Sequence, residues 1–445
     1  MDFSTIFSSL GGGVFTLLAF VVVISVIVAI HEYGHYIVGR WSGIHADVFS
    51  LGFGKVLFSR VDSRGTKWQI AALPFGGYVK FRGDANAASG KDGEAMQGLS
   101  DEELRHTMHG APLWARVATV AAGPIFNFAL SILIFAGLAM TVGVEKTPLT
   151  VAEVIELPGG TGDLRAGDIL RSVEGMSLES GDDLPDTFEA LKTNASLLNY
   201  EITRDGVDMT VLGPQLQPAL VSAVSPDSAA HEAGLKEGDV ILSVDGTPIS
   251  YFGQLIPIVE ATQGAPMDLL VWRNGQELPF VLQAKRTDLP LADGGFETRW
   301  LIGISSRYAF TPANETTGPF EALKLGVTAT ERVITQSLSG MYHMIVGKIS
   351  TCNISGPIGI AKVSGQAAQG GIDNFISFIA IISTAIGLMN LFPIPVLDGG
   401  HLVFYAYEAV TGKPPSDAWM RGLMTVGLGL VLSLMSLGIF TDLFC

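Results

Sequence analysis

The stretch ISVIVAIHEYGHYIVGR, Ile24 to Arg40, joins a long apolar run to ionisable side chains. No charged residue occurs between Val14 and Ile30, and His31, Glu32 and His35 follow directly. Ionisable groups at the end of a bilayer-length segment cost several kcal/mol unless they are paired or solvated. The stretch therefore predicts a membrane helix that carries a functional set of side chains.

Four uncharged segments predict four transmembrane helices, because each is about as long as the 20 residues that cross some 30 Å of hydrocarbon. They are Phe3 to Ile30, Val117 to Val144, Asn374 to Leu397 and Gly422 to Thr441. The first lacks a basic n-region and a small-residue cleavage site, so we interpret it as a mature span rather than a signal peptide.

The charges and cysteines of the chain exclude several classes of protein. A net charge of −16 argues against nucleic-acid binding, for which a basic patch is expected. The two cysteines, Cys352 and Cys445, provide neither a disulfide framework nor zinc-finger spacing.

Lysine and arginine predict the orientation in the membrane. None precedes His31, whereas ten lie from Arg40 to Arg116, and Lys413 and Arg421 lie between the last two spans. Both of these connections should be cytoplasmic. Both termini and the large polar middle of the chain should then lie outside.

The middle of the chain contains an internal repeat. DLRAGDILRSVEG, Asp163 to Gly175, aligns without a gap with GLKEGDVILSVDG, Gly234 to Gly246. Hairpin turns follow each copy, at the Asp-Gly of ITRDGV and the Asn-Gly of VWRNGQ, because these residues tolerate positive φ. We predict two tandem copies of one small β-rich domain.

The repeated pattern resembles the PDZ fold, more closely in the second copy than in the first. PDZ domains bind extended peptides by adding a strand to a sheet edge. A purely structural role, as spacers that hold a lid over the membrane, remains the alternative, since no peptide pocket can be identified from the sequence.

The motif HEYGH has the spacing of a zinc site. His31 and His35 lie four residues apart, so a helix places both imidazoles on one face, where they can share one zinc ion. Glu32 lies beside them and can take a proton from an activated water molecule. The alternative is a chance match at a helix end.

A catalytic zinc site needs a third protein ligand at the same membrane depth. The third span should run in the same direction as the first, and about 24 residues along it, near the inner edge, comes Asp398. His401, three residues further on, is the competing candidate. The remaining histidines should be ordinary polar or surface residues; they are His45, His106, His109, His231 and His343.

These motifs together resemble the site-2 protease family of intramembrane zinc metalloproteases. The resemblance rests on HExxH in the first span and on Asn390-x-x-Pro393-x-Pro395-x-Leu397-Asp398-Gly399 in a later one. Two PDZ-like domains between the second and third spans resemble the bacterial regulator-of-sigma-E branch in particular. The resemblance implies Zn²⁺ on His31, His35 and Asp398, with Glu32 as the catalytic glutamate.

The resemblance also implies a substrate and a location. The substrate would be a single-span membrane protein of the anti-sigma-factor type whose outer domain has been trimmed, or a remnant signal peptide. The PDZ pair would exclude substrates with bulky outer domains. The protein would lie in a bacterial inner membrane with both termini and the PDZ domains periplasmic and the active site near the cytoplasm. The oligomeric state stays open.

Substrate binding is expected at the break that Pro393 and Pro395 impose on the third span, because a proline cannot continue a regular helix. By resemblance, Asn390 contacts the substrate main chain; the alternative is that it caps the broken helix. For Asn127 in AAGPIFNFALS we favour helix packing over a role at the metal. The strand-like segments after the first span resemble the family's membrane-associated β-hairpin, whose edge could pair with unwound substrate; a simple anchored hairpin is the alternative.

The predicted fold is a multi-pass α-helical membrane protein with four transmembrane helices and two tandem PDZ-like domains between the second and third. The predicted segments are 1–40, the first helix with the zinc motif; 41–112, the β-hairpin region; 113–146, the second helix; 148–214 and 215–290, the PDZ-like domains; 316–371, an amphipathic surface segment; 372–403, the third helix; and 419–443, the fourth.

Two other functions are compatible with parts of this pattern. A metal transporter could place His and Asp in the membrane, although it would usually have several polar spans. A non-catalytic PDZ scaffold would bind membrane partners without needing Glu32.

Overall fold

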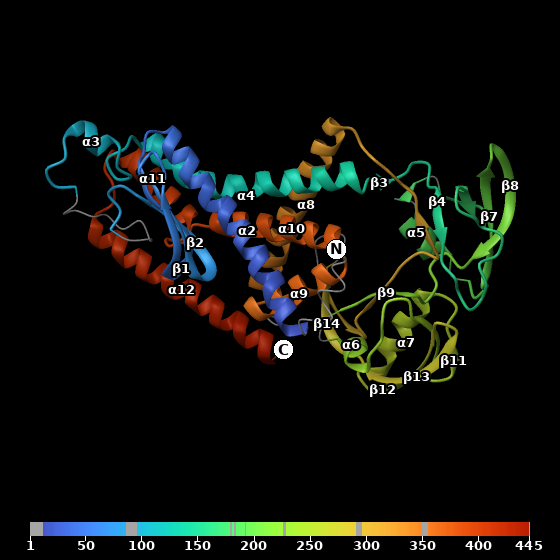
Figure 1. Cartoon of the computed structure of the whole chain (residues 1–445). Coiled ribbons are helices and arrows are strands. Elements are labelled where there is room, and N and C mark those ends of the chain that lie inside the picture. Colours follow the sequence, from blue (N-terminus) through green and yellow to red (C-terminus); the bar gives the residue numbers. More distant parts are fainter. Residues whose placement is uncertain are drawn as a thin grey trace. The chain divides into compact units, whose positions relative to one another are not determined.

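The computed structural model describes residues 12–85, 96–178, 180–181, 184–191, 193–225, 228–290, 296–348 and 355–444. Both cysteines and the start of the first predicted span lie outside these ranges. The chain divides into two compact units, coloured along the sequence in Figure 1. The helical unit comprises 1–139, 318–342 and 351–445, and the β unit comprises 140–317 and 343–350.

Four helices among the described residues are long and apolar enough to cross a membrane, as predicted. They are α2 (Gly12–Trp41), α4 (Leu113–Thr141), α10 (Ile372–Asn390) and α12 (Asp417–Phe444). Among the described residues, four further helices lie wholly or mainly in the helical unit: α3 (Asp101–Arg105), α8 (Pro319–Ile345), α9 (Pro357–Gln369) and α11 (Asp398–Thr411).

Helix α2 packs through one stripe of side chains. Its buried residues recur every four positions, at Phe15, Ala19, Val23, Ile27 and His31. Val23 and Ile27 form an apolar core with Ile379 of α10. Residues four apart lie on one helical face, so His31 and His35 lie on the same face of α2 as the stripe that packs against the unit.

The predicted amphipathic segment 316–371 forms α8 and α9. The buried face of α8 consists of small residues, Ala322, Gly326 and Thr330. A Cβ on Gly326 would lie 2.4 Å from the Ile132 carbonyl oxygen of α4, so the two backbones approach closely there.

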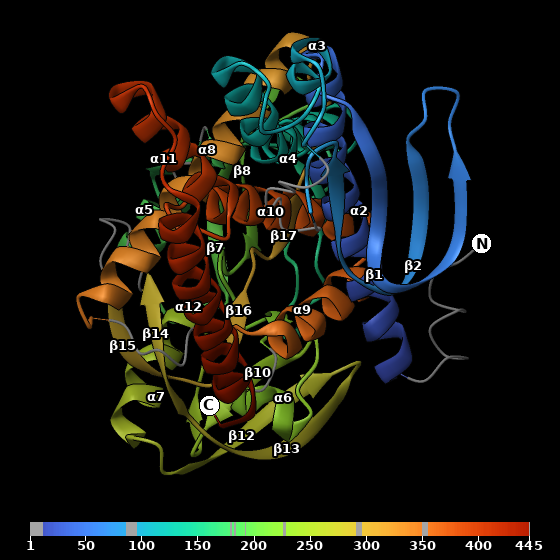
Figure 2. The ribbon, with the colours of Figure 1, turned by 90° about the vertical axis from the view of Figure 1, so that its left-hand side faces the viewer.

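The predicted third span, 372–403, is broken as its prolines indicate. Helix α10 ends at Asn390, and α11 begins at Asp398. Asp398 therefore occupies the first turn of a new helix, and Figure 2 shows α11 as a segment separate from α10.

Strands β1 (Ala46–Val61) and β2 (Lys67–Phe81) form the predicted hairpin sheet beside α2. The strands bend and pair twice. Val48 lies opposite both Lys80 and Lys67, and Val61 also lies opposite Lys67. The last part of β2, 77–81, is therefore an edge of this sheet, and within the described residues no strand pairs with its outer side.

The β unit contains two four-stranded sheets with the same strand order, β6-β5-β7-β8 and β11-β10-β12-β13. The first comprises β5 (Ile169–Val173), β6 (Met176–Ser177), β7 (Leu197–Arg204) and β8 (Val207–Pro214), with α5 (Leu184–Ala190). The second comprises β10 (Val240–Val244), β11 (Thr247–Pro248), β12 (Pro266–Arg273) and β13 (Gln276–Gln283), with α6 (Ala229–Ala233), η2 (Phe252–Gln254) and α7 (Leu255–Thr262).

Short strand pairs complete the β unit. Those pairs are β3 (Val144–Glu145) with β18 (Asn314–Glu315), β4 (Val151–Val154) with β17 (Phe310–Pro312), β9 (Val221–Val224) with β16 (Ile304–Ser306), and β14 (Lys285–Pro290) with β15 (Phe296–Leu301).

Equivalent ion pairs support the repeat. In the first copy, Asp168 accepts two hydrogen bonds from Arg204, both at 2.7 Å. In the second, Asp239 accepts two from Arg273, at 2.6 and 2.7 Å. Both carboxylates are buried, so each arginine satisfies a charge that would otherwise be costly in the interior.

The two copies are nested rather than strictly consecutive. Phe310, which follows the second copy in sequence, belongs to the apolar core of the first. Ile302 belongs to the core of the second. The structure thus adds 309–312 to the segment predicted as 148–214 and extends that predicted as 215–290 to about 306. Sequence periodicity identified each repeat, but it could not reveal that β17, a strand distant in sequence, completes the core of the first copy.

This nesting predicts a selective effect of Phe310→Ala. Removing a buried Phe side chain typically costs about 3–5 kcal/mol. Hydrogen–deuterium exchange of the full chain should show lost protection in β4, β5 and β7 while β10 and β12 stay protected. Ile302→Ala is the matched control and should give the reverse pattern. Equal loss in both copies after Phe310→Ala would contradict the assignment of β17 to the first core.

Candidate metal centre

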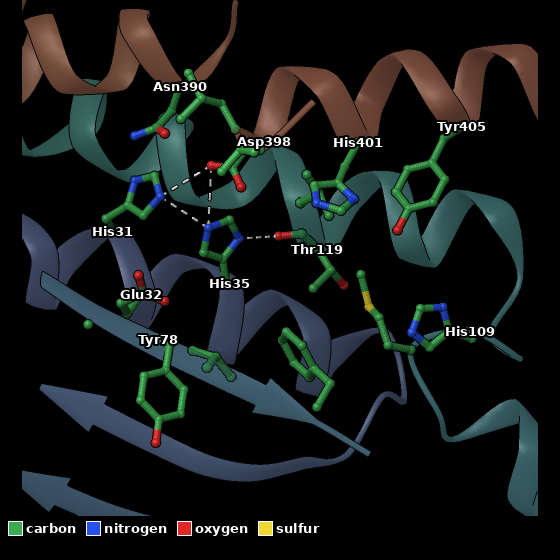
Figure 3. A pocket seen from close by; sticks show the side chains of 17 residues that line it. His31, Glu32, His35, Tyr78, His109, Thr119, Asn390, Asp398, His401 and Tyr405 are labelled. Carbon is green, nitrogen blue, oxygen red and sulfur yellow. Dashed lines mark hydrogen bonds and ion pairs between the residues drawn. The ribbon is translucent and has the colours of Figure 1, made fainter. Parts of the chain in front are cut away.

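Two histidines and one aspartate from distant parts of the chain meet in the helical unit (Figure 3). The Nε2 atoms of His31 and His35 lie 3.2 Å apart. Oδ2 of Asp398 lies 3.2 Å from Nε2 of His31 and 3.5 Å from Nε2 of His35. Three potential ligand atoms thus form a nearly equilateral triangle.

The triangle fits a tetrahedral zinc ion. Zinc bound to nitrogen and oxygen at about 2.0–2.1 Å requires ligand atoms about 3.3–3.4 Å apart. The Asp398 oxygen is buried and has no hydrogen-bond partner among the described residues, and the two imidazole nitrogens face it. Three electron-pair donors around one point are stable only with a cation or shared protons between them. The residues present therefore fit the metal that the motif predicted.

The orientation of His35 is fixed by the backbone of α4. Its Nδ1 donates to the carbonyl oxygen of Thr119 at 2.9 Å. With the proton on Nδ1, the lone pair of Nε2 points at Asp398. Such hydrogen bonds to the other ring nitrogen fix the tautomer of metal-binding histidines.

The orientation of His31 depends on Asn127. The Asn127 side chain is fully buried in α4, and its Nδ2 lies 3.2 Å from Nδ1 of His31. Within the part of the chain that the structure describes, its Oδ1 has no hydrogen-bond partner. A half-turn of the carboxamide exchanges its two ends, so Oδ1 can accept the Nδ1 proton when Nε2 of His31 binds a metal.

Two glycines allow the backbones of α2 and α4 to approach closely here. A Cβ on Gly34 would lie 2.6 Å from the Ala122 carbonyl oxygen. A Cβ on Gly123 would lie 2.3 Å from Nε2 of His35. Any side chain at position 123 would fill the space that the histidine ring occupies.

Glu32 lies in a cavity of about 240 Å³ together with the three ligand candidates. Gly77, on the sheet edge, faces it: a Cβ there would lie 3.1 Å from Cγ of Glu32. Val79, two residues further along this edge, lines the same cavity. Figure 3 shows Glu32 between the histidines and this strand. A general base is therefore available next to the metal centre.

The other predicted site residues have different positions. His401 lines the same cavity but is not one of the three clustered ligand candidates. This arrangement favours Asp398 over His401 as the third metal ligand. Asn390 also lines it, and its Nδ2 donates to the Ile386 carbonyl oxygen at 3.1 Å, so it has the capping contact proposed as the alternative. Pro393 and Pro395 lie in the break between α10 and α11 but are not among the residues that line the cavity. Val396 and Leu397, from the same break, do line it.

Two residues contribute more than the sequence indicated. Asn127, for which we favoured a packing role, faces His31. The sequence feature that could have revealed this contact is a carboxamide within an apolar helix, because such a group is costly without a polar partner. His109, expected to be an ordinary polar residue, lines the cavity. Its position follows from tertiary contacts that no local pattern reveals.

Asn127→Ala should weaken zinc binding about 10–100-fold, the usual loss when the partner of a histidine ligand is removed. Competition with a metal chelator in detergent measures this affinity. Ser131→Ala, one turn along the same buried face of α4, is the matched control and should leave affinity unchanged. Unaltered affinity in Asn127→Ala would show that Asn127 does not orient His31.

Comparisons with known proteins agree with this geometry. The profile of peptidase family M50 matches residues 19–434. A Rhizobium meliloti protein named as a zinc metalloprotease is 35% identical over 431 residues, covering 96% of both chains. One from Agrobacterium fabrum is 33% identical over 435 residues, covering 96% of this chain and 95% of its own. The regulator of sigma-E protease RseP of Salmonella typhimurium is 31% identical over 457 residues, covering 96% of this chain and 98% of its own.

The matched range contains the metal centre, all of α4 and α10 and most of α2 and α12, and the relatives are aligned over nearly their whole length. It confirms the resemblance to the site-2 proteases, the enzymatic assignment and zinc as the metal. The chain belongs to peptidase family M50 and is a membrane zinc metalloprotease.

Proposed function

We propose that this enzyme hydrolyses peptide bonds within or near the membrane-spanning segment of single-span proteins. The observation that carries the proposal is the zinc-fitting triangle of His31, His35 and Asp398, built from helices α2 and α11 beside a carboxylate base. His31 lies near the end of a helix that is long and apolar enough to span the bilayer.

The three ligand residues would hold Zn²⁺, which supplies Lewis-acid chemistry by activating water and polarising a carbonyl group. Glu32 is placed to accept the proton of the attacking water and to return it to the leaving amine. Thr119 and Asn127 keep the imidazoles in the tautomers that binding requires.

The sheet edge at 77–81 offers a place for the substrate main chain. A transmembrane helix hides its peptide bonds, so it must be extended before cleavage. Gly77, Tyr78, Val79 and Phe81 line the cavity, and the outer side of their strand is unpaired within the described part of the chain. An extended segment could add to this edge as peptides add to other sheet edges. Asn390, on the other side of the cavity, has a carboxamide that could contact the same segment.

The hairpin itself has the surface of a membrane-associated element. Leu57, Phe58 and Val61 are each at least 60% exposed, and Leu73 is about half exposed. A cluster of exposed large apolar side chains marks an interaction surface. We propose that it inserts into the bilayer next to the site, at the cytoplasmic side that the lysines and arginines indicate.

The name of the Salmonella relative, a regulator of sigma-E, supports a signalling substrate. We propose a pre-trimmed anti-sigma factor, or a remnant signal peptide, in a bacterial inner membrane with the β unit periplasmic. The scaffold and transporter alternatives are weaker, because neither accounts for a glutamate base beside the metal ligands.

Glu32→Gln should retain stoichiometric zinc and lose cleavage by at least about 10²-fold, since the general base is removed and the ligands are not. The assay is mass spectrometry of a single-span substrate incubated with purified enzyme in liposomes. Chelation should abolish wild-type cleavage and added zinc should restore it. Glu102→Gln, at an exposed glutamate in α3, is the control. A fully active Glu32→Gln enzyme would remove Glu32 from the mechanism.

We propose that the two β-rich copies are PDZ domains that act as a size filter. The second contains an apolar cavity of about 280 Å³ between α7 and the segment Trp300 to Ile304, the place where a peptide strand would bind. Ile256 lines this groove and is 39% exposed, so a ligand could reach it.

Ile256→Arg should therefore reduce the preference for a trimmed substrate over one that keeps a folded outer domain. The measurement is the ratio of cleavage rates for the two substrates in liposomes. Val281→Arg, on β13 outside the groove, is the matched control. An unchanged ratio in Ile256→Arg would favour domains that serve only as spacers.

A further inference from the structure

One end of the active-site cavity is lined by polar side chains that the zinc chemistry does not use. Two of them, His401 and Tyr405, follow the ligand candidate Asp398 along one face of α11 at spacings of three and four residues, and all three line the cavity. His109 lies beyond them, near Tyr405 (Figure 3). The cavity therefore extends from the metal ligands to His109.

His109 is held in place by a buried carboxylate. Oδ1 of Asp84 lies 3.2 Å from Nε2 of His109, and the Asp84 side chain is fully buried. Neither atom has a hydrogen-bond partner among the described residues, so the facing His109 nitrogen is the polar group closest at hand for this buried carboxylate oxygen. Burial raises the pKa of the Asp84 carboxyl, and the nearby His109 ring acts against this shift. With Nε2 committed to Asp84, Nδ1 of His109 is the nitrogen left to bind another group.

The same carboxylate ties His109 to the sheet edge. Oδ2 of Asp84 accepts the backbone N–H of Phe81 at 3.0 Å. The backbone N–H of Met108 donates to the Arg82 carbonyl oxygen at 2.9 Å. Asp84 and the backbone contact thus fix His109 relative to the end of the strand 77–81.

The strand connects this subsite with the chemistry. Gly77 faces Glu32, whereas Phe81 ends the strand at Asp84. Four residues of strand span about 13 Å at 3.3 Å per residue. A substrate segment paired with this edge would reach His109 about three or four residues from the cleaved bond.

Main-chain pairing alone cannot select which bond is cut, because it repeats along the substrate. We propose that His109, oriented by Asp84, binds a polar side chain of the substrate that carries a hydrogen-bond donor, and so sets the register of cleavage. His109 is then a specificity residue and Asp84 a positioning residue. Polar residues are rare within membrane spans, so one such side chain marks a unique register. This inference rests on the proposed proteolytic function.

The test uses purified full-length enzyme in liposomes and a series of single-span substrates in which one Gln is moved along an otherwise apolar segment. Mass spectrometry of the products locates each cut. In wild type the cut should move with the Gln at a constant spacing. In His109→Leu the spacing should be lost and several adjacent bonds should be cut, while zinc content stays stoichiometric.

Further variants separate positioning from folding. Asp84→Asn should broaden the cut sites in the same way, and the double variant with His109→Leu should be no worse than either alone, because Asp84 acts through His109. His109→Gln, which can still bind a donor, should retain part of the spacing. Asp47→Asn breaks an exposed ion pair with Arg82 next to the same turn and is the control; its cut sites should match wild type.

The experiment separates failure of the inference about His109 from failure of the proposed proteolytic function. If His109→Leu, or His109→Ala should the former not fold, cuts at the wild-type spacing throughout the series, the inference about His109 is overturned while the protease assignment stands. If wild type with bound zinc cuts none of the substrates and no other single-span protein, the proposed function itself fails.

Discussion

Two imidazoles and a carboxylate lie within 3.5 Å of one another in the helical unit, although more than 360 residues separate the carboxylate from the imidazoles in the sequence. Grouping three such donors in a poorly solvated place is unfavourable without a cation between them. The helices of this unit bring the three side chains together. The buried stripe of α2 directs both histidines inward, and the break after α10 places Asp398 at the start of α11.

Helix α4 orients the site without providing a ligand. Gly123 leaves space for the His35 ring, the Thr119 carbonyl fixes His35, and Asn127 faces His31. The same helix is fixed to α10, because the hydroxyls of Ser131 and Ser383 donate across the interface to backbone carbonyls. Polar contacts within apolar helices thus serve packing and metal orientation together. The sheet edge at 77–81 and the His109 side chain, which faces Asp84, line another side of the cavity.

The sequence predicted the parts of this arrangement that have local causes. HExxH on a helix, the prolines that end α10 and the alternation in β1 and β2 each follow from short-range geometry, and the structure has them where expected. The depth argument from charge distribution placed Asp398 at the level of the histidines but left His401 as a competitor, and the family resemblance favoured Asp398. The nested closure of the first β-rich copy by Phe310 and the position of His109 depend on long-range contacts, which no periodicity encodes. Asn127 is intermediate: its polarity in an apolar helix was visible, but its partner was not.

The central claim is that one zinc ion is held by His31, His35 and Asp398. X-ray absorption spectroscopy at the zinc edge of the purified protein tests it directly. We expect a four-coordinate site with two imidazole nitrogens, oxygen ligands and no sulfur, and a changed set of ligand atoms in Asp398→Ala. A sulfur ligand, or a spectrum that Asp398→Ala leaves unaltered, would contradict it.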